Sequence, residues 1–294
     1  MSRSAASRAN RRGERPPSPE PLPAPAVDSH THLDIVLSGF RPEDGQPPAH
    51  EDVDAEIAEA AAVGVPRLVQ VGVDVPSSRW SAELAARHPN VLAAVALHPN
   101  EAGAGAATDD ALAEIDRLAA LPRVRAVGET GLDRYRTGPD GWAAQEASFR
   151  AHIRIAQERG VALVIHDRDA HEEILRVLED EGAPEHVVMH CFSGDASFAR
   201  ACVERGFVLS FAGTLTFGNA GYLREAAALT PVEQLLVETD SPFLTPMPFR
   251  GRPNASRLVP HTVRALAEVT GVELTELCAH LTATAERVFG SWNR

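Results

Sequence analysis

The sequence contains no lysine, because all 28 of its basic residues are arginine. Schiff-base catalysis, pyridoxal phosphate chemistry and the phosphate-binding P-loop each require a lysine amine. The absence of lysine therefore excludes three large classes of enzyme before any motif is considered.

Cysteines and long apolar runs are also scarce. Cys191, Cys202 and Cys278 have no C-x-x-C spacing, which is typical of reduced thiols in a cytosolic protein rather than of a disulfide framework. No segment has the roughly 18 unbroken apolar residues of a membrane span. The composition thus predicts a cytoplasmic protein without a membrane segment.

Positive charge is outweighed by negative charge, and the formal net charge is −13. A surface that is negative overall repels polyanions, which argues against a protein that coats nucleic acid non-specifically. An enzyme with local contacts to nucleic acid remains compatible with this charge. Aromatic residues make up only 5% of the chain, which leaves little for a long base-stacking track.

Residues 1–26 differ in composition from the rest of the chain, with scattered arginines and a proline-rich run. Such a segment buries too little apolar area to offset the entropy lost on ordering. Arg11 and Arg12 resemble a twin-arginine export signal, but the proline-rich run follows them where an apolar stretch is required. We expect a disordered tail over 1–26 and a single folded domain over 27–294.

From Val27 onward, short apolar runs alternate with amphipathic stretches. Runs that predict further strands cover 67–73, 91–97, 124–128, 161–165, 186–189, 207–211 and 235–238. Stretches that predict helices cover 50–62, 77–88, 108–121, 141–159, 170–180, 195–205, 221–229, 259–270 and 274–289, and a Pro/Gly loop covers 39–49.

This alternation implies parallel strands joined by right-handed crossovers. Eight repeats favour an α/β fold of the (β/α)8 TIM-barrel type, and no G-x-G-x-x-G follows a strand to suggest a Rossmann fold.

The first expected strand carries two histidines, His30 and His32, one residue apart. Side chains alternate faces along a strand, so both imidazoles project to the same side. Neutral imidazole is a common ligand of zinc and similar metals. An isolated H-x-H is weak evidence for a metal site, because two surface histidines on a strand would give the same sequence pattern.

Other residues of metal-ligand type recur at the carboxyl ends of the expected strands, the end at which TIM barrels place their functional site. They are Glu129, His166, His190 and Asp240. Alone, His166 could be a hydrogen-bonded core histidine and Asp240 a helix cap. Together with His30 and His32 they form a mixed nitrogen and oxygen set that suits Zn, Mn, Ni, Fe or Mg. Six ligands exceed one open tetrahedral site and favour two metals bridged by a carboxylate.

Six motifs in order resemble those of the TatD-type deoxyribonucleases, a family of the metal-dependent hydrolase superfamily. They are V-D-S-H-T-H-L-D (27–34), A-L-H-P (96–99), V-G-E-T-G-L-D (127–133), V-I-H-D-R-D-A (164–170), M-H-C-F-S-G (189–194) and E-T-D-S-P-F-L (238–244). The resemblance spans 27–294 and implies a TIM barrel that hydrolyses DNA from a 3′ end with divalent metals. It also implies a link to DNA repair and degradation.

The resemblance implies roles for individual residues. One metal would be held by His30, His32, Glu129 and Asp240, and a second by Glu129, His166 and His190, with Glu129 bridging. Glu129 and Asp240 would be catalytic, and Asp240 would orient or deprotonate the attacking water.

The loop after the last expected strand departs from the family pattern R-G-K-R-N-E-P. It reads Arg250-Gly251-Arg252-Pro253-Asn254-Ala255-Ser256, and so loses the second Arg, the Glu and the Pro. The resemblance implies substrate contacts by the retained Arg250, Arg252 and Asn254 and by His98. Guanidinium groups bind phosphate bidentately, which supports this role for the two arginines. The alternative for His98 is that the His-Pro pair simply ends a strand.

Three functions are compatible with the sequence. The motifs favour a two-metal phosphodiesterase acting on DNA, with a single-stranded 3′ end as its substrate. A related hydrolase of an amide, lactone or small ester, for example an aminoacyl-tRNA ester, is the alternative. Many such relatives bridge their metals with a carbamylated lysine, which this chain lacks. A non-catalytic barrel is disfavoured by six intact ligands.

Overall fold

The computed structural model describes residues 14–38 and 53–292. Eight parallel strands form one sheet in the order of the chain. They are β1 (Val27–Thr31), β2 (Arg67–Val71), β3 (Val91–Val95), β4 (Val124–Asp133), β5 (Ala162–Arg168), β6 (Val187–Met189), β7 (Val208–Phe211) and β8 (Leu235–Val237).

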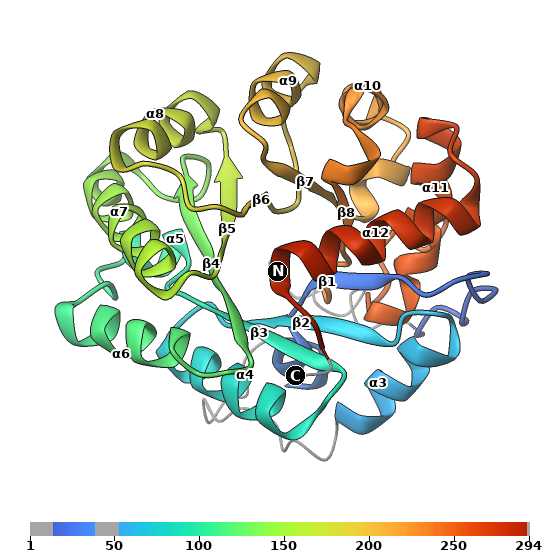
Figure 1. Cartoon of the computed structure of the whole chain (residues 1–294), viewed down its shortest axis with the longest axis horizontal. Coiled ribbons are helices and arrows are strands. Elements are labelled where there is room, and N and C mark those ends of the chain that lie inside the picture. The colour runs from blue at the N-terminus through green and yellow to red at the C-terminus, as the bar shows by residue number, and fades with distance from the viewer. Residues whose placement is uncertain (1–13, 39–52, 293–294) are drawn as a thin grey trace, which may run out of the picture.

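Helices surround the strands as a ring, and α12 crosses one end of the barrel (Figure 1). The helices are α2 (Leu33–Ser38), α3 (Val53–Ala62), α4 (Val75–Arg87), α5 (Pro99–Gly103), α6 (Asp109–Ala119), α7 (Trp142–Arg159), α8 (His171–Glu181), α9 (Ala196–Glu204), α10 (Gly221–Leu229), α11 (Val259–Thr270) and α12 (Leu274–Phe289). The predicted TIM barrel is confirmed.

Two layers of apolar side chains hold the barrel together. Small aliphatic residues such as Val69, Ala94 and Ala126 fill its interior. Phe289 at the end of α12 and Trp292 just after the helix join them. A larger cluster packs the outer face of the strands against the helices. The interior is thus a packed core closed at one end by α12, which leaves the opposite end of the strands for a site.

The barrel closes where β1 meets the segment that follows β8. Asp240 N–H donates to the His30 carbonyl at 2.9 Å, and His32 N–H donates to the Ser241 carbonyl at 3.0 Å. Asp28 is fully buried, and it accepts hydrogen bonds from the backbone N–H of Thr239 at 2.8 Å and its hydroxyl at 2.6 Å. Backbone pairing across this seam therefore places the first histidines beside the last candidate ligand.

Most predicted elements lie within a few residues of the observed ones, and the differences have local causes. Helix α4 begins at Val75, not at the predicted Ser77, because Asp74 is the N-cap and Ser77 completes a capping box with it. Thr108 is the N-cap of α6, where the sequence predicted the start of that helix. The short helices α2 and α5 were not predicted.

The two strands that carry Glu129 and His166 are longer than predicted. β4 continues to Asp133 and β5 to Arg168. The last residues of these two strands pair with each other, from Thr130 with Ile165 to Asp133 with Arg168. Glu129 and His166 thus lie within strands and not after them. The predicted loop at 39–49 and the first residues of the predicted helix 50–62 lie outside the described residues.

Residues 14–26 are ordered, contrary to the disorder expected for 1–26. Leu22 is buried and its N–H donates to the Val63 carbonyl at 3.0 Å. Arg15 forms an ion pair with Glu56 at 2.6 Å on α3. Composition alone did not predict this segment because its ordering depends on contacts with distant helices. Residues 1–13 lie outside the described part.

Across the described ranges, no helix is long and apolar enough to cross a membrane.

Candidate metal centre

The predicted metal ligands converge at the open end of the barrel. His30 lies in β1, Glu129 in β4 and His166 in β5, while the remaining three lie one to three residues after the ends of β1, β6 and β8. Those three are His32, His190 and Asp240. The register of β1 shifts between Asp28 and Thr31, and that of β4 shifts between Val127 and Thr130. Such irregularities re-aim side chains, and here they flank His30 and Glu129.

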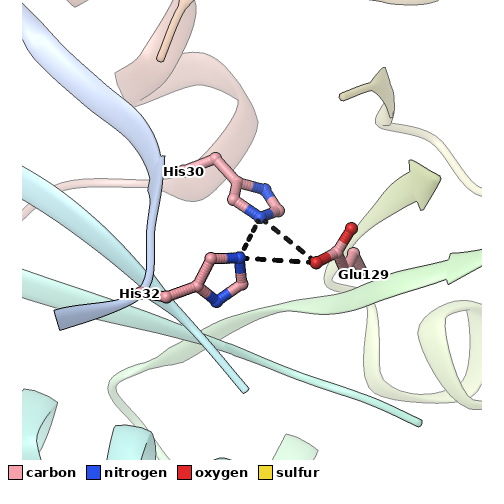
Figure 2. A group of neighbouring side chains, drawn as sticks. All are labelled: His30, His32 and Glu129. Carbon is pink, nitrogen blue, oxygen red and sulfur yellow. Dashed lines mark hydrogen bonds and ion pairs between the residues drawn. The ribbon is translucent and has the colours of Figure 1, made fainter. Parts of the chain in front are cut away.

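The two carboxylate oxygens of Glu129 face different groups of histidines. Oε1 lies 3.6 Å from Nε2 of His30 and 3.4 Å from Nε2 of His32 (Figure 2). Oε2 lies 3.2 Å from Nδ1 of His166 and 3.2 Å from Nε2 of His190. A single side chain therefore belongs to two ligand groups.

Asp240 completes the group around Oε1. Its Oδ1 lies 3.5 Å from Nε2 of His32 and 4.0 Å from Nε2 of His30. Asp240 has φ of +51°, a left-handed conformation that is unusual for a residue with a side chain and is often found at functional sites.

The spacing of these atoms fits ligation of metal ions. Two ligand atoms bound to one tetrahedral ion at about 2.1 Å lie about 3.4 Å apart. Nε2 of His30 and Nε2 of His32 are 3.2 Å apart, and both face Oε1 of Glu129. All three side chains are buried, so a divalent ion would also balance the charge of the enclosed carboxylate.

Polar contacts, two of them hydrogen bonds, turn the ligand nitrogens toward Glu129. Nδ1 of His32 donates to the Val71 carbonyl at 3.0 Å, which leaves the Nε2 lone pair facing the cluster. Nδ1 of His190 lies 2.8 Å from Oε1 of Glu238, and Nε2 of His166 lies 3.3 Å from Oδ2 of Asp133. Partners of this kind hold ligand imidazoles in one orientation.

Sequence reasoning did not identify Glu238 or Asp133 as part of the site, although both lie in the quoted motifs. Both are buried. Asp133 in β4 contacts His166 in the neighbouring β5, and Glu238 after β8 contacts His190 after β6. Gly131 in the same motif has φ of +137°, and a β-carbon there would lie 2.1 Å from the His166 carbonyl. The G-L-D sequence therefore serves the close packing of β4 against His166.

His98 differs from the ligand histidines in the ring nitrogen that carries the hydrogen. Its Nδ1 accepts the Asn100 N–H at 3.0 Å, so the hydrogen of the neutral ring is on Nε2, 3.7 Å from Oε2 of Glu129. Burial lowers the pKa of His98 to about 3, against the opposing effect of Glu129. His98 is consequently a neutral hydrogen-bond donor at the edge of the cluster.

Burial and neighbouring charges act in opposite directions on the pKa values of His32 and Glu129. Burial disfavours charge on His32, yet Asp240 and Glu129 raise its pKa to about 10. Burial likewise opposes the charge on Glu129, but the surrounding histidines hold its pKa well below the usual range. The carboxylates thus attract positive charge, which a bound metal would supply in place of protons.

A family model for TatD related DNases matches residues 27–290. The chain belongs to the TatD related DNase family. The TatD-type resemblance of the six motifs is thereby confirmed.

Similar proteins agree with this assignment. A Mycobacterium tuberculosis protein named an uncharacterized metal-dependent hydrolase TatD is 48% identical over 273 residues, 91% of this chain and 99% of its own length. A Citrobacter rodentium protein named a 3′-5′ ssDNA/RNA exonuclease TatD is 35% identical over 247 residues, 82% of this chain and 92% of its own length. The chain is a metal-dependent hydrolase of the TatD family.

The solved structure of the TatD homolog YJJV from Escherichia coli has the same fold. It aligns with a TM-score of 0.81 at 24% sequence identity and covers 90% of this chain and 98% of that one.

The predicted substrate residues of the TatD loop after β8 lie in two different settings. Arg250 and Arg252 are exposed, and their guanidinium carbons lie 4.3 Å from the ring centroid of Phe217 and 5.8 Å from that of Phe249. Both are available to a ligand.

Asn254 is buried, in contrast to these arginines. Its amide donates to the carbonyls of Thr239 at 3.0 Å and Phe243 at 2.5 Å, and its oxygen accepts the Ala255 N–H. Its side chain holds the loop against the segment after β8, and the substrate contact of Asn254 stays a prediction.

Proposed function

We propose that the protein is a divalent-metal-dependent 3′-5′ exonuclease of single-stranded DNA that uses two metal ions. The observation that carries the proposal is the division of the Glu129 carboxylate, with one oxygen facing His30 and His32 and the other facing His166 and His190. A carboxylate shared in this way suits the metal pairs with which phosphodiesterases act. The family, and relatives named 3′-5′ ssDNA/RNA exonucleases, support the substrate.

Each residue would have a defined part in the reaction. His30, His32, Glu129 and Asp240 would hold one ion, and Glu129, His166 and His190 the other. Bound divalent ions supply Lewis-acid polarisation of the phosphoryl oxygen and a nucleophile at neutral pH.

Asp240 would orient the attacking water and take its proton. Burial opposes ionisation of Asp240, but His32 and the other histidines lower its pKa, so the side chain is a carboxylate that can accept a proton. His98 would donate its Nε2–H to a phosphate oxygen.

The experiment compares linear and circular single-stranded DNA of the same sequence, with duplex DNA and RNA, in Mg²⁺, Mn²⁺ or Zn²⁺. We expect shortening of the linear strand from its 3′ end, dependence on added metal, loss of activity with a chelator, and resistance of the circle. Cleavage of circle and linear strand at equal rates would contradict an exonuclease. Hydrolysis of a carboxylic or aminoacyl ester, with no nucleic acid cut in any metal, would favour the related-hydrolase alternative.

A further inference from the structure

An exposed tyrosine lies at the end of the two longest strands of the barrel. Tyr135 is 68% exposed and follows β4 by two residues, and the guanidinium carbon of Arg168 lies 4.9 Å from its ring centroid. Arg168 pairs with Asp133 in the β4–β5 register, and its carbonyl accepts the Arg134 N–H at 2.9 Å. The hydrogen-bonded ends of β4 and β5 therefore support the tyrosine–arginine pair.

Asp133 connects this pair to the metal centre. Its Oδ1 accepts the backbone N–H of Tyr135 at 3.0 Å and that of Arg136 at 2.7 Å. Its Oδ2 lies 3.3 Å from Nε2 of His166. One buried carboxylate thus sets the position of the exposed ring relative to a candidate metal ligand.

The neighbouring pair of Arg134 and Trp142 has a different character. The Arg134 guanidinium lies 4.7 Å from the Trp142 ring centroid, is largely buried, and forms an ion pair with Glu173 at 2.5 Å. Arg168 is exposed, and within the described ranges it has no carboxylate at ion-pair distance. Arg134 serves the fold, whereas Arg168 and Tyr135 present an aromatic face and an unneutralised positive charge to solvent.

We propose that Tyr135 and Arg168 form a stacking platform for a nucleobase near the end of the bound strand. The inference rests on the proposed function, because it assigns the base contact of the same site. A base stacks on an aromatic ring or on a guanidinium plane, and the positive charge suits the adjacent phosphate. Stacking accepts any base, so the platform recognises the presence of a base and not its identity.

Binding of two fluorescein-labelled oligonucleotides tests the platform. Both carry phosphorothioate linkages at the 3′ end to resist hydrolysis, and one has abasic tetrahydrofuran residues in its last three positions. With Mn²⁺-loaded full-length protein, we expect the oligonucleotide with bases to bind about tenfold more tightly than the abasic one. Tyr135→Leu should reduce this ratio to below about twofold, and Tyr135→Phe should retain it.

Tyr222→Leu is the matched control. Tyr222 is the other tyrosine of the chain, is 46% exposed, and lies on α10, which is apart from β4 and β5 in Figure 1. Its replacement should leave the ratio unchanged. Equal binding of both oligonucleotides by the wild type, or a full ratio in Tyr135→Leu, would overturn the platform.

The platform and the proposed function fail in different ways. In one outcome, the wild type hydrolyses single-stranded DNA while Tyr135→Leu shows an unchanged binding ratio. That result would contradict the stacking platform and support the proposed nuclease. If the wild type cuts no nucleic acid in any metal, the nuclease is wrong, and the binding ratio still decides whether Tyr135 holds a base.

Discussion

Glu129 is the residue on which both ligand groups depend. Because its two oxygens face separate pairs of histidines, Glu129→Ala should lower the bound metal of both sites and abolish hydrolysis while the barrel stays folded. Metal content by mass spectrometry, with circular dichroism as the test of folding, checks this result. Two full equivalents of metal in the variant would contradict the proposal that Glu129 bridges the two ions.

Asp240→Asn is the comparison for Glu129→Ala. The amide keeps the shape of the side chain but cannot accept a proton, so most metal should remain while turnover falls by about 10²- to 10⁴-fold. Turnover equal to that of the wild type would contradict the proposed role of Asp240.

His98 and His190 should respond differently to substitution although both face Oε2 of Glu129. Since Nδ1 of His98 accepts the Asn100 N–H, we expect Nε2 to carry the hydrogen of the neutral ring and not to ligate a metal. His98→Ala should therefore retain metal and lose about 10- to 100-fold in kcat/KM, the value of a hydrogen bond to a charged group. His190→Ala should lose metal as well as activity. Equal metal loss in His98→Ala and His190→Ala would indicate that His98 is also a metal ligand.

The sequence predicted individual residues best where strand ends determined their place. Six candidate ligands converge because the carboxyl ends of parallel strands meet at one end of a barrel. Glu238 and Asp133 were missed because their role depends on which histidine they touch across strands. The buried backbone contacts of Asn254 were not predicted, because a motif cannot distinguish an amide that binds substrate from one that binds backbone.

At the scale of elements, α7 is joined to the end of β3 by a buried histidine. Nε2 of His152 accepts the Leu97 N–H at 3.1 Å, and Nδ1 donates to the Ser148 carbonyl at 2.7 Å. Burial lowers the pKa of His152 from 6.5 to about 4. The folded protein therefore holds this ring neutral, next to the residue that precedes His98.

This lowered pKa makes stability depend on pH in a predictable direction. Above pH 6.5 the ring is neutral in the folded and unfolded states, and no penalty arises. As the pH falls from 6.5 toward 4, the unfolded chain binds a proton that the folded protein excludes, so the free energy of unfolding decreases by about 3 kcal/mol in total.

Thermal or denaturant unfolding of the wild type and of His152→Gln at pH 7, 5.5 and 4 measures this effect. The glutamine can replace both hydrogen bonds but does not titrate, so its stability should fall less over this range. Parallel pH profiles of the two proteins would contradict the assignment.

The sequence predicted the elements well because most of them carry a local signal. Thr108 marks the start of α6, and the apolar runs mark the strands. The extension of β4 and β5 above the barrel and the packing of residues 14–26 are set by contacts between distant segments. The local sequence pattern around a residue does not indicate such long-range contacts.

For the whole molecule, a net charge of −13 means that the proposed DNA substrate would have to approach through a local positive patch. Arg250 and Arg252 are exposed in the loop after β8 and provide such a patch. Replacing both by alanine should raise KM more than it lowers kcat. It should also reduce the salt dependence of single-strand binding by about 1.4 in log–log slope, the value for two lost phosphate contacts.

A double variant on the opposite end of the barrel separates local contact from net charge. Arg87, in the last turn of α4, and Arg205, the C-cap of α9, are exposed. Arg87→Ala with Arg205→Ala removes the same charge and should leave KM and the salt slope close to the wild-type values. Similar slopes in both double variants would mean that the overall field, and not the loop, binds DNA.

The seam between β1 and the segment after β8 also determines when the first ligand group can form during synthesis. Asp28 and Thr239 are hydrogen-bonded across a separation of 211 residues, and His30 meets Asp240 at the same place. A nascent chain on the ribosome exposes its first two histidines long before their carboxylate partner is translated. The first ligand group needs Asp240 beside His30 and His32, so it can assemble only after the chain has been translated past Asp240.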